Sequence, residues 1–491
     1  MSKKKNIMKK ITLCVTCTLL GAISAISMQS FADSGKDSLP VQDLRTLAEV
    51  YAQIKANYYQ ETTNDKLIQD AVKGMVHGLD PHSEYLLSKD FEDLKEHTTG
   101  EFGGLGMEIG KKNDAIVVIA PIEDTPAERA GLQSGDYIIK INDESTRGMS
   151  TTEAVKLMRG KPGTDINLTI TRENSSVPIE VKITRAMIQV KSVRSKLLEE
   201  GYAYIRVSQF QERTTQDLVN HIKELTKQNK GELKGLVLDL RDNPGGLLNQ
   251  AVGVSAVFLK KGDVVVSTKG RDGRNATSHR ADRSGYLLGR NNQKDPLEGL
   301  PEEVKKLPLT VLINSGSASA SEIVTGALQD YKRAVILGVS SFGKGSVQSV
   351  MPLSNGSGIK LTIALYYTPH DRSIQAQGIV PDIEVKDKRD AFQMREADLS
   401  GHLNNPFGGE ENKGKIDEEA SNLKKEDAKE KTDDEKFDEL LSRRDPNPEK
   451  DDVLKKALEV LKDSQLYQDS IGLAEKEGRN KVDEKKISSN E

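Results

Sequence analysis

Leu236-Val-Leu-Asp-Leu-Arg-Asp-Asn-Pro-Gly-Gly246 is the stretch that decides the fold of this chain. Its first five residues are apolar except for Asp239, a pattern typical of a strand buried on both faces of a sheet. The strand runs directly into a turn with two glycines, and a helix is predicted over residues 249–258. A buried strand, a turn and a helix form the repeating unit of an α/β fold. We therefore expect residues 187–388 to form an α/β domain.

The rest of this predicted domain repeats the alternation of strands and helices. The further predicted strands are 202–207, 309–313, 334–337 and 346–351, and the further predicted helices are 214–227 and 320–331. Residues 268–308 break the pattern because they are polar and rich in arginine, asparagine and glycine. We expect a long surface excursion there.

Residues 95–186 have the rhythm of a small β-rich domain with one longer helix, which the capping box Ser150-Thr-Thr-Glu153 opens. Gly103-Gly-Leu-Gly-Met107 precedes a predicted strand. Backbone N–H groups in such a turn can hold the terminal carboxylate of a peptide, which then pairs with the strand edge. The sequence therefore predicts a peptide-binding groove. The residues predicted to form it are Leu105, Gly106, Met107, Ile109, Val155 and Met158.

Two alternatives remain open in this domain. Each groove residue taken alone fits the ordinary core of a small β domain, although the loop, strand and helix together favour peptide binding. Arg159, at the end of the helix, could contact the α/β core and couple peptide binding to activation. It could also be only a cation beside the C-terminal end of the helix dipole.

The two ends of the chain differ from the middle. Residues 33–94 form a helical arm with two amphipathic helices, which favours packing or dimerisation. Residues 389–452 are a charged, low-complexity tail, in which 27 of the 43 residues from Glu410 to Asp452 are charged, and we expect part of it to be disordered. Residues 453–491 begin with an amphipathic helix, which is either a docking segment or an oligomer contact.

Residues 1–32 have the pattern of a signal peptide. Five lysines precede an apolar run from Ile11 to Ile26, and Ser30-Phe-Ala32 places small residues at the cleavage site. The alternative is an uncleaved anchor, for which 16 residues are short. We expect export to the cell envelope, the periplasm, with membrane association if the segment is kept. Both cysteines of the chain, Cys14 and Cys17, lie in this segment, so cleavage would exclude a cysteine nucleophile, a disulfide framework and a zinc–thiolate site.

Composition restricts the partners further. The net charge is -4, and no basic stripe indicates binding of nucleic acid. We expect neither a metal nor a cofactor. The predicted groove indicates partner proteins with exposed C-terminal tails, which would be protein substrates if the chain is an enzyme. Candidates for further partners are a second copy of the chain, bound through the N- and C-terminal helices, and an envelope adaptor protein.

Two later stretches point to chemistry: Gly316-Ser-Ala-Ser-Ala-Ser-Glu-Ile323 and Phe342-Gly-Lys-Gly-Ser-Val-Gln348. The first opens a helix, whose free N–H groups can stabilise an oxyanion, here through Ala320. Gly245 or Gly246 supplies a second donor from the turn after the buried strand. Spacing does not choose a nucleophile among three serines of the first stretch, Ser317, Ser319 and Ser321. Ser319-Ala-Ser-Glu322 is also a capping box, so Ser319 could be only a helix cap.

A serine nucleophile needs a base. None of the seven histidines has a recognisable nucleophile-and-base setting in the sequence. Lysine serves when burial keeps it neutral, and the glycines on both sides of Lys344 allow such close packing. Gln348, four residues later, could hydrogen-bond Lys344 or orient it without adding charge.

Several long motifs occur in one order and carry a family resemblance. They are Leu79–Leu86, Asp239–Gly246, Gly316–Glu322, Gly338–Gln348 and Thr368–Asp382. Residues from about 65 to 386 resemble the C-terminal processing (tail-specific) peptidases, and residues 95–186 resemble a PDZ domain. The resemblance implies a crotonase-like protease core with an inserted PDZ domain. It also implies that Ser319 is the nucleophile, Lys344 its general base and Gln348 the orienting partner. Pro369–Arg372 departs from the turn usual in that family.

The function expected from the whole sequence is an exported serine endopeptidase with PDZ-guided substrate choice. One alternative is a catalytically silent PDZ scaffold that binds peptides. Another is a crotonase-type acyl-transfer enzyme that acts on a thioester, against which the PDZ domain and the export signal count.

Overall fold

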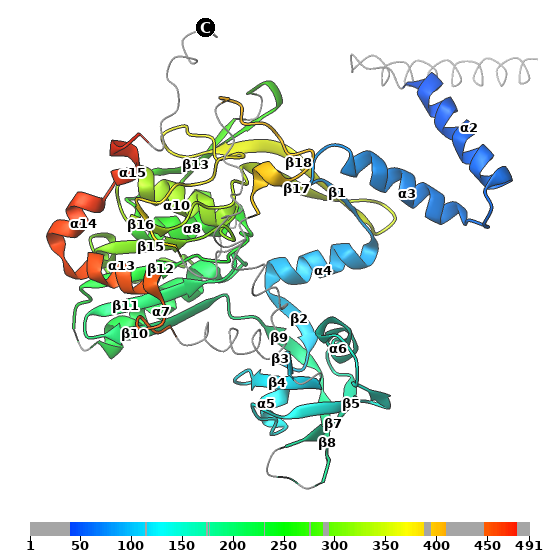
Figure 1. The fold of residues 1–491 in the computed structure, drawn as a ribbon, viewed down its shortest axis with the longest axis horizontal. Helices are drawn as coiled ribbons and strands as arrows, with labels where there is room; N and C mark the ends of the chain where they lie inside the picture. The colour runs from blue at the N-terminus through cyan, green and yellow to red at the C-terminus, as the bar shows by residue number, and fades with distance from the viewer. Residues whose placement is uncertain are drawn as a thin grey trace, which may run out of the picture. The chain divides into compact units, whose positions relative to one another are not determined.

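The computed structural model describes residues 40–112, 115–172, 175, 177–229, 231–273, 276–287, 294–386, 394–408 and 446–478. The predicted signal peptide lies outside these residues, and so does most of the charged tail. The described residues fall into two compact units divided at Gly74, whose main elements are labelled in Figure 1.

Two helices form the N-terminal region, as the apolar periodicity predicts. They are α2 (Val41–Asn57) and α3 (Asn64–His77). None of the side chains of α2 is buried, and the apolar Leu44, Leu47 and Val50 are about half exposed. The helix therefore presents an apolar stripe on its surface.

The β-rich domain contains a six-stranded sheet with the order β3-β4-β5-β7-β8, in which β6 pairs with β5. A separate two-stranded ribbon, β2–β9, joins the two ends of the domain. Leu105 and Met158 lie in the buried core of the β-rich domain, and Met107 and Ile109 pack against that core. The elements are β2 (Glu101–Gly104), β3 (Met107–Lys112), β4 (Ala115–Pro121), α5 (Pro126–Arg129), β5 (Tyr137–Ile141), β6 (Glu144–Ser145), α6 (Thr151–Met158), β7 (Asp165–Thr171), β8 (Ile179–Thr184) and β9 (Ala186–Gln189).

A second six-stranded sheet organises the α/β domain, with the order β10-β11-β12-β15-β16-β19. All neighbours pair in parallel except β10 and β11. All five residues of β12 and all five of β15 are buried, as the apolar runs predict. The strands are β10 (Val193–Glu199), β11 (Tyr202–Val207), β12 (Gly235–Asp239), β15 (Leu309–Ile313), β16 (Val335–Gly338) and β19 (Ile383–Glu384).

A third sheet has the order β1-β18-β13-β14, with β17 also paired to β18. Its strand β1 comes from the motif before the β-rich domain, so residues far apart in the sequence meet here. The elements are β1 (Glu84–Leu86), α4 (Ser88–Thr99), which follows it, β13 (Val264–Gly270), β14 (Thr277–Arg280), β17 (Ser346–Pro352) and β18 (Gly358–Tyr367).

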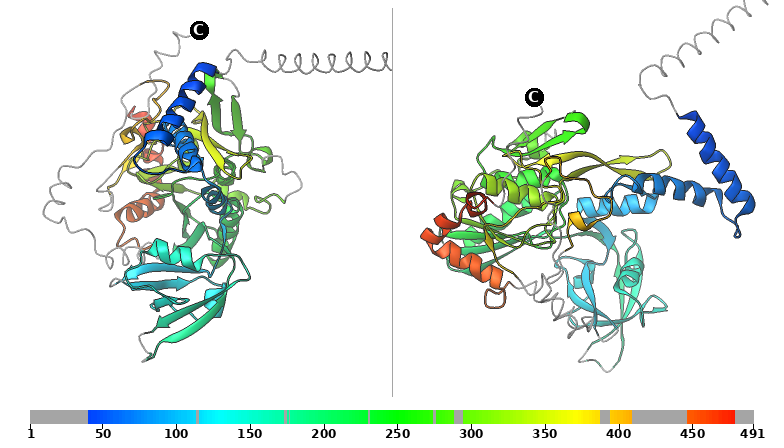
Figure 2. Two further views of the ribbon diagram at one scale, coloured as in Figure 1. Left: turned by 90° about the vertical axis from the view of Figure 1, so that its right-hand side faces the viewer. Right: turned by 45° about the horizontal axis from the view of Figure 1, so that its top comes forward.

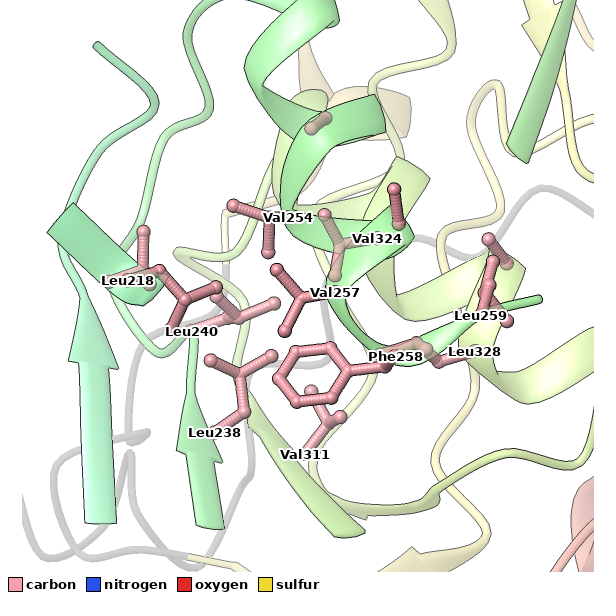
Figure 3. Packing of buried hydrophobic residues seen from close by; sticks show 14 of the residues in the cluster. Leu218, Leu238, Leu240, Val254, Val257, Phe258, Leu259, Val311, Val324 and Leu328 are labelled. Atoms are coloured by element: carbon pink, nitrogen blue, oxygen red, sulfur yellow. The ribbon is translucent and has the colours of Figure 1, made fainter. Parts of the chain in front are cut away.

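Three helices share the main apolar core with one face of the parallel sheet: α7 (Thr214–Gln228), α8 (Leu248–Phe258) and α10 (Ala320–Asp330). Figure 3 shows Phe258 of α8 between Leu238 and Val311 of the sheet and Leu328 of α10. Helix α10 is buried along its whole length. Its N-terminus is therefore held rigidly at the end of β15.

The C-terminal helix α13 (Asp452–Lys462) covers the opposite face of that sheet, followed by α14 (Ser464–Ser470) and α15 (Leu473–Lys476) (Figure 2). Its buried Val453, Leu454 and Leu458 share a core with Val237 and other sheet residues. The sequence left open whether this helix is a docking segment or an oligomer contact. The structure favours a docking segment, because the apolar stripe of α13 packs on the chain's own sheet.

The prediction of a surface excursion at residues 268–308 is wrong in part. The described residues of this stretch contain most of the β13–β14 hairpin, the helix α9 (Arg283–Leu287) and a 3₁₀ turn, Glu302–Lys305. Tyr286, Leu287 and Val304 are buried in the main core. Polar residues dominate the composition of this stretch, so the composition does not reveal its few buried residues.

Candidate active site

Ser319 has an unusual backbone, with φ 54° and ψ -111° immediately before the first residue of α10. Non-glycine residues rarely adopt positive φ, and such strain concentrates at functional sites. The N–H of Ser319 donates to Glu322 Oε2 over 2.8 Å, so the carboxylate half of the predicted capping box is present. Ser319 itself is partly exposed.

The two neighbouring serines serve the fold instead. Ser317 and Ser321 are fully buried. The Ser317 hydroxyl donates to the carbonyl of Leu240, and the Ser321 hydroxyl donates to the carbonyl of Asn243, each over 2.8 Å. Geometry therefore favours Ser319 where spacing left three candidates.

The glycine turn lies directly against Ser319. A Cβ added to Gly245, whose φ is +106°, would lie 2.9 Å from Ser319 Cβ and 3.0 Å from the nitrogen of Ala320. The N–H of Gly245, however, donates to the side chain of Asn243 over 2.9 Å. Gly246 packs against the backbone of Phe210. Of the two predicted glycine donors, Gly245 is thus engaged within its own turn.

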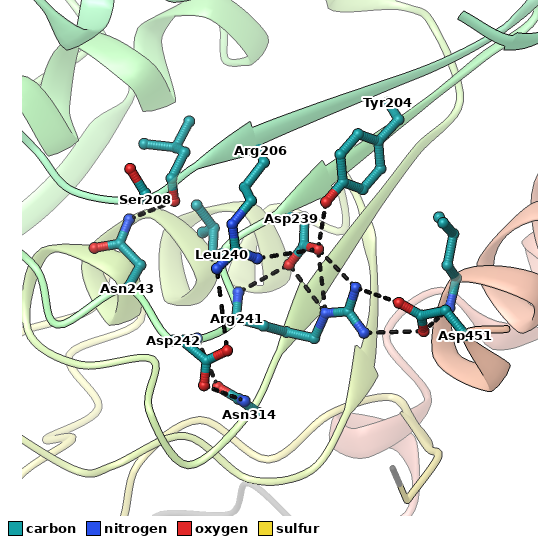
Figure 4. Close-up of polar contacts among 12 residues, drawn as sticks. Tyr204, Arg206, Ser208, Asp239, Leu240, Arg241, Asp242, Asn243, Asn314 and Asp451 are labelled. Atoms are coloured by element: carbon teal, nitrogen blue, oxygen red, sulfur yellow. Dashed lines mark hydrogen bonds and ion pairs between the residues drawn. The ribbon is translucent and has the colours of Figure 1, made fainter. Parts of the chain in front are cut away.

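A buried ion cluster fixes the start of this turn (Figure 4). The guanidinium of Arg241 lies between Asp239 and Asp451, with closest contacts of 2.7 and 2.8 Å. Tyr204 also donates to Asp239, and Arg206 lies 3.4 Å from it. Burial alone would raise the pKa of Asp239, but Arg241 and Arg206 hold it well below the usual range.

Lys344 lies in a tightly packed loop between two glycines. A Cβ on Gly345 would lie 2.7 Å from the nitrogen of Gln375, so only glycine fits there. Burial lowers the pKa of Lys344 to about 8, and the nearby cation of Lys360 adds to this effect. The carboxylates of Glu396, Glu322 and Asp80 oppose it. A lysine in this setting is neutral far more often than an exposed one.

The loop of Lys344 and the backbone of Ser319 share two buried partners. The Lys344 N–H donates to Glu322 over 2.9 Å, the same carboxylate that receives the Ser319 N–H. The Tyr366 hydroxyl contacts the carbonyl oxygens of both Ser319 and Lys344. Among the described residues, no hydrogen bond joins Ser319 Oγ to Lys344 Nζ. The structure thus holds the two backbones together without closing a side-chain dyad.

The hydrogen bond predicted between Gln348 and Lys344 is not formed. Gln348 Nε2 donates to Ser346 Oγ over 3.0 Å and to Thr362 Oγ1 over 3.1 Å. Thr362 is the partner of Gln348 in the β17–β18 ladder, and a register shift just before Gln348 turns its side chain toward these hydroxyls.

Sequence reasoning missed a polar network that reaches this site from the motif before the β-rich domain. Thr362 donates to Asp80, which also receives hydrogen bonds from the hydroxyl of Ser83 and the N–H of His82. Burial alone would raise the pKa of Asp80, but these hydrogen bonds lower it. His82 Nε2 lies 2.8 Å from the fully buried Glu396. A histidine after a proline, as in Asp80-Pro-His82, is typical of an ordinary turn residue. His82 instead connects Glu396, in segment 394–408, to the network around Asp80.

A serine and a histidine also meet elsewhere, although the sequence shows no such setting. Ser195 Oγ lies 2.7 Å from His221 Nδ1, and burial lowers the pKa of His221. Ser195 lies within β10, where it pairs with Ile205. Ser195 is thus an internal strand residue and not, like Ser319, the residue that precedes the N-terminus of a helix.

The predicted groove residues lie on β3, α6 and the turn before β3. Gly103 and Gly104 belong to the strand β2, so the turn consists of Leu105 and Gly106 only. Val155 lies partly exposed on α6. Arg159 contacts Glu96 over 2.9 Å and lies over the ring of Phe102, rather than reaching the α/β domain as the coupling hypothesis expects.

Three regions of the chain match known families. Residues 201–385 match peptidase family S41, residues 117–172 match the PDZ domain, and residues 17–90 match the N-terminal domain of activating protease CtpB. A carboxy-terminal-processing protease of Bartonella bacilliformis is 41% identical over 405 residues, which cover 80% of this chain and 88% of the relative. The chain belongs to the carboxy-terminal-processing proteases of peptidase family S41. This carboxy-terminal-processing protease therefore combines a peptidase domain with a PDZ domain on a mixed α/β fold.

Two other relatives of the protease are similar over less of this chain. A probable CtpA-like serine protease of Staphylococcus aureus is 37% identical over 76% of this chain and 72% of its own. The structure of a photosystem II D1 C-terminal processing protease is 28% identical, with a TM-score of 0.40, over 72% of this chain and 91% of that one.

The described part of the protease contains no group of three or more His, Cys, Asp or Glu side chains that could hold a metal ion. Within the same residues, none of the helices combines the length and apolar character needed to cross a bilayer.

Proposed function

We propose that this protease is an exported serine endopeptidase that binds substrate C-termini in its PDZ domain and cleaves peptide bonds with Ser319 and Lys344. The observation that carries the proposal is that a strained, partly exposed serine at a helix N-terminus shares buried backbone partners with a lysine of lowered pKa. The Glu322 carboxylate and the Tyr366 hydroxyl tie the backbones of the two residues.

In the proposed mechanism, Ser319 Oγ attacks the peptide carbonyl while neutral Lys344 takes its proton. Lys344 then protonates the leaving amine, and water hydrolyses the acyl-enzyme. Ala320 and the glycine turn hold the oxyanion. Gly246 is the available donor of that turn, because the N–H of Gly245 must first leave Asn243. Since catalytic hydrogen bonds are often long without substrate, the dyad is expected to close when substrate binds.

Gln348 supports the dyad indirectly in this proposal. Its hydrogen bonds to Ser346 and Thr362 fix the strand that begins just after Lys344, so it orients the loop rather than the amine. The peptide would be held by the groove residues on β3 and α6. They are Leu105, Gly106, Met107, Ile109, Val155 and Met158, with Arg159 at the end of the helix.

Cleavage of a peptide with a free apolar C-terminus tests the proposal. Ser319→Ala and Lys344→Ala should each lower kcat/KM by more than about 1000-fold, because the nucleophile or its base is lost. Both variants should still bind the peptide in a fluorescence titration. Ser321→Ala, two residues further along the same helix, is the matched control and should keep kcat within about threefold. Full activity of Ser319→Ala would disprove the proposed role of Ser319 and point to another nucleophile. A wild type that binds the peptide without cleaving it would instead favour the alternative, a catalytically silent peptide-binding scaffold.

Several coarser features belong to the same proposal. The core is of the crotonase-like type, supported by the alternation of parallel strands and helices from β11 onward. Residues 95–186 select the substrate and residues 187–388 cleave it. Residues 1–32 direct export to the periplasm, supported by the lysine-rich start and the short apolar run. An envelope adaptor protein remains a predicted partner.

A further inference from the structure

Glu322 receives a dense set of hydrogen bonds at the candidate site. It is fully buried on the first turn of α10, and its carboxylate receives four hydrogen bonds. The Ser341 hydroxyl and the Gly343 N–H donate to Oε1 over 2.6 and 2.7 Å. The N–H groups of Ser319 and Lys344 donate to Oε2 over 2.8 and 2.9 Å. One oxygen atom therefore accepts from the backbones of both proposed catalytic residues.

A helix cap alone does not explain these contacts. The same chain contains a second capping box, in which Glu153 receives the N–H and the hydroxyl of Ser150. Glu153 is exposed, and these local hydrogen bonds lower its pKa. Three of the four donors to Glu322 come instead from the loop 341–344, about 20 residues away. Glu322 thus joins the nucleophile's helix to the base's loop.

We propose that Glu322 is a positioning residue that fixes the backbones of Ser319 and Lys344 relative to each other. The inference rests on the proposed function, because it requires that these two residues react. Glu322 acts through them and does not touch the substrate. Without the hydrogen bonds to Glu322, the loop of Lys344 could move away from Ser319. Misplacement of a catalytic group by about 1 Å can lower the reaction rate by two orders of magnitude.

The charge of Glu322 also reaches the base. Burial raises the pKa of Glu322 to about 7, although its four hydrogen bonds oppose this. When ionised it raises the pKa of Lys344, as Glu396 and Asp80 also do, while Lys360 lowers it. Arg395 and Tyr366 face Glu322 as well. Removing the charge of Glu322 should therefore lower the pH at which Lys344 becomes neutral.

Two variants separate the position of the carboxylate from its charge. Glu322→Gln keeps the size, but its amide NH₂ must face one of the two pairs of donors, so half of the hydrogen bonds are lost. Glu322→Asp keeps the charge on a side chain that is one methylene too short to reach all four donors. Glu153→Gln is the matched control, since it changes a capping box that uses the same Ser and Glu residue types away from the candidate site.

The test measures, on the full chain, the rate at which a small fluorophosphonate probe acylates the protein between pH 6 and 10. Both Glu322 variants should react about 10- to 100-fold more slowly. The midpoint of the pH profile should move to lower pH in Glu322→Gln and stay in place in Glu322→Asp. Glu153→Gln should match the wild type in rate and midpoint. A purely structural role would not move the midpoint.

Two results would overturn the inference. One is a Glu322→Gln rate within twofold of wild type with an unchanged midpoint. The other is failure of both Glu322 variants to show cooperative thermal unfolding, which would make the carboxylate a requirement of the fold. Ser319→Ala distinguishes this from failure of the proposed function. If Ser319→Ala reacts like wild type, the proposed nucleophile is wrong, whereas an inert Ser319→Ala beside a normal Glu322→Gln refutes only the positioning role.

Discussion

At the scale of single residues, the site depends on residues whose properties are set by the folded environment and cannot be read from the neighbouring sequence. Lys344 is a cation by type, but burial and Lys360 lower its pKa to about 8. Ser319 reads as an ordinary helix cap, yet its backbone is strained and the serines on both sides have buried, hydrogen-bonded hydroxyls. The structure therefore distinguishes three serines that the sequence makes equivalent.

The pH dependence of acylation follows from the pKa of Lys344. The neutral amine is the active form, so the rate of probe acylation should rise with pH through about 8 and level off above pH 9. At pH 7 only about one-tenth of the lysine is neutral. Stopped-flow measurement over pH 6 to 10 checks this profile. A rate that is flat in this range, or one that still rises tenfold per pH unit at pH 10, would contradict the assignment of the base.

At the scale of elements, the end of β12 is held by charge rather than by apolar packing. Asp239 is buried between Arg241, Arg206 and Tyr204 (Figure 4). Arg241 also forms an ion pair with Asp451, the N-cap residue of α13. The strand, the glycine turn and the C-terminal helix thus form one connected group. The family match ends at residue 385, so this contribution of α13 lies beyond it.

Neutralising the centre of this cluster should destabilise the domain. Asp239→Asn leaves two buried guanidinium groups without their shared carboxylate and should lower the free energy of unfolding by about 3–5 kcal/mol. Asp451→Asn is the milder control, because Arg241 keeps Asp239 and asparagine still caps a helix; we expect about 1–2 kcal/mol. Urea denaturation measures both. Equal losses in the two variants would show that Asp239 is not the centre of the cluster.

The elements themselves follow from the sequence more completely than the site does. The strand at residues 309–313 is predicted to the residue, because a continuous apolar run between polar turns has only one buried arrangement. The apolar stripe of residues 453–461 likewise predicts α13 but not what it packs against. Glu396 and Asp80 could not be found in this way, since they join the site through contacts between residues 279–314 positions apart. Local patterns carry no information about which loops meet.

Gln348 shows a different limit of prediction. The resemblance implies that it orients Lys344, but a register shift in the ladder places its amide on two hydroxyls instead. Such a shift depends on the pairing partner β18 and not on the sequence around Gln348. The motif therefore names Gln348 as a candidate residue but does not give its contacts.

At the scale of the whole molecule, the two ends of the chain differ in how their apolar surfaces are covered. The stripe of α13 is buried on its own sheet, while Leu44, Leu47 and Val50 of α2 are about half exposed. We therefore keep self-association through the N-terminal helices as a prediction. An exposed apolar stripe of this kind favours association with a second helix.

A charge in this stripe should weaken that association. Leu47→Asp should shift the sedimentation of the full chain from an oligomer toward the monomer, since a buried carboxylate has no partner there. Glu49→Gln, on the opposite side of the helix, should leave the sedimentation coefficient unchanged. A wild-type chain that sediments as a monomer at all concentrations would end this prediction without affecting the catalytic proposal.

The central claim is that Ser319 alone is the nucleophile of this protease. The most direct test is mass spectrometry of the intact protein after reaction with a fluorophosphonate, followed by mapping of the modified residue. We expect one adduct per chain, located on Ser319, and none in Ser319→Ala. An adduct on Ser317, Ser321 or Ser195, or an adduct that persists in Ser319→Ala, would contradict it.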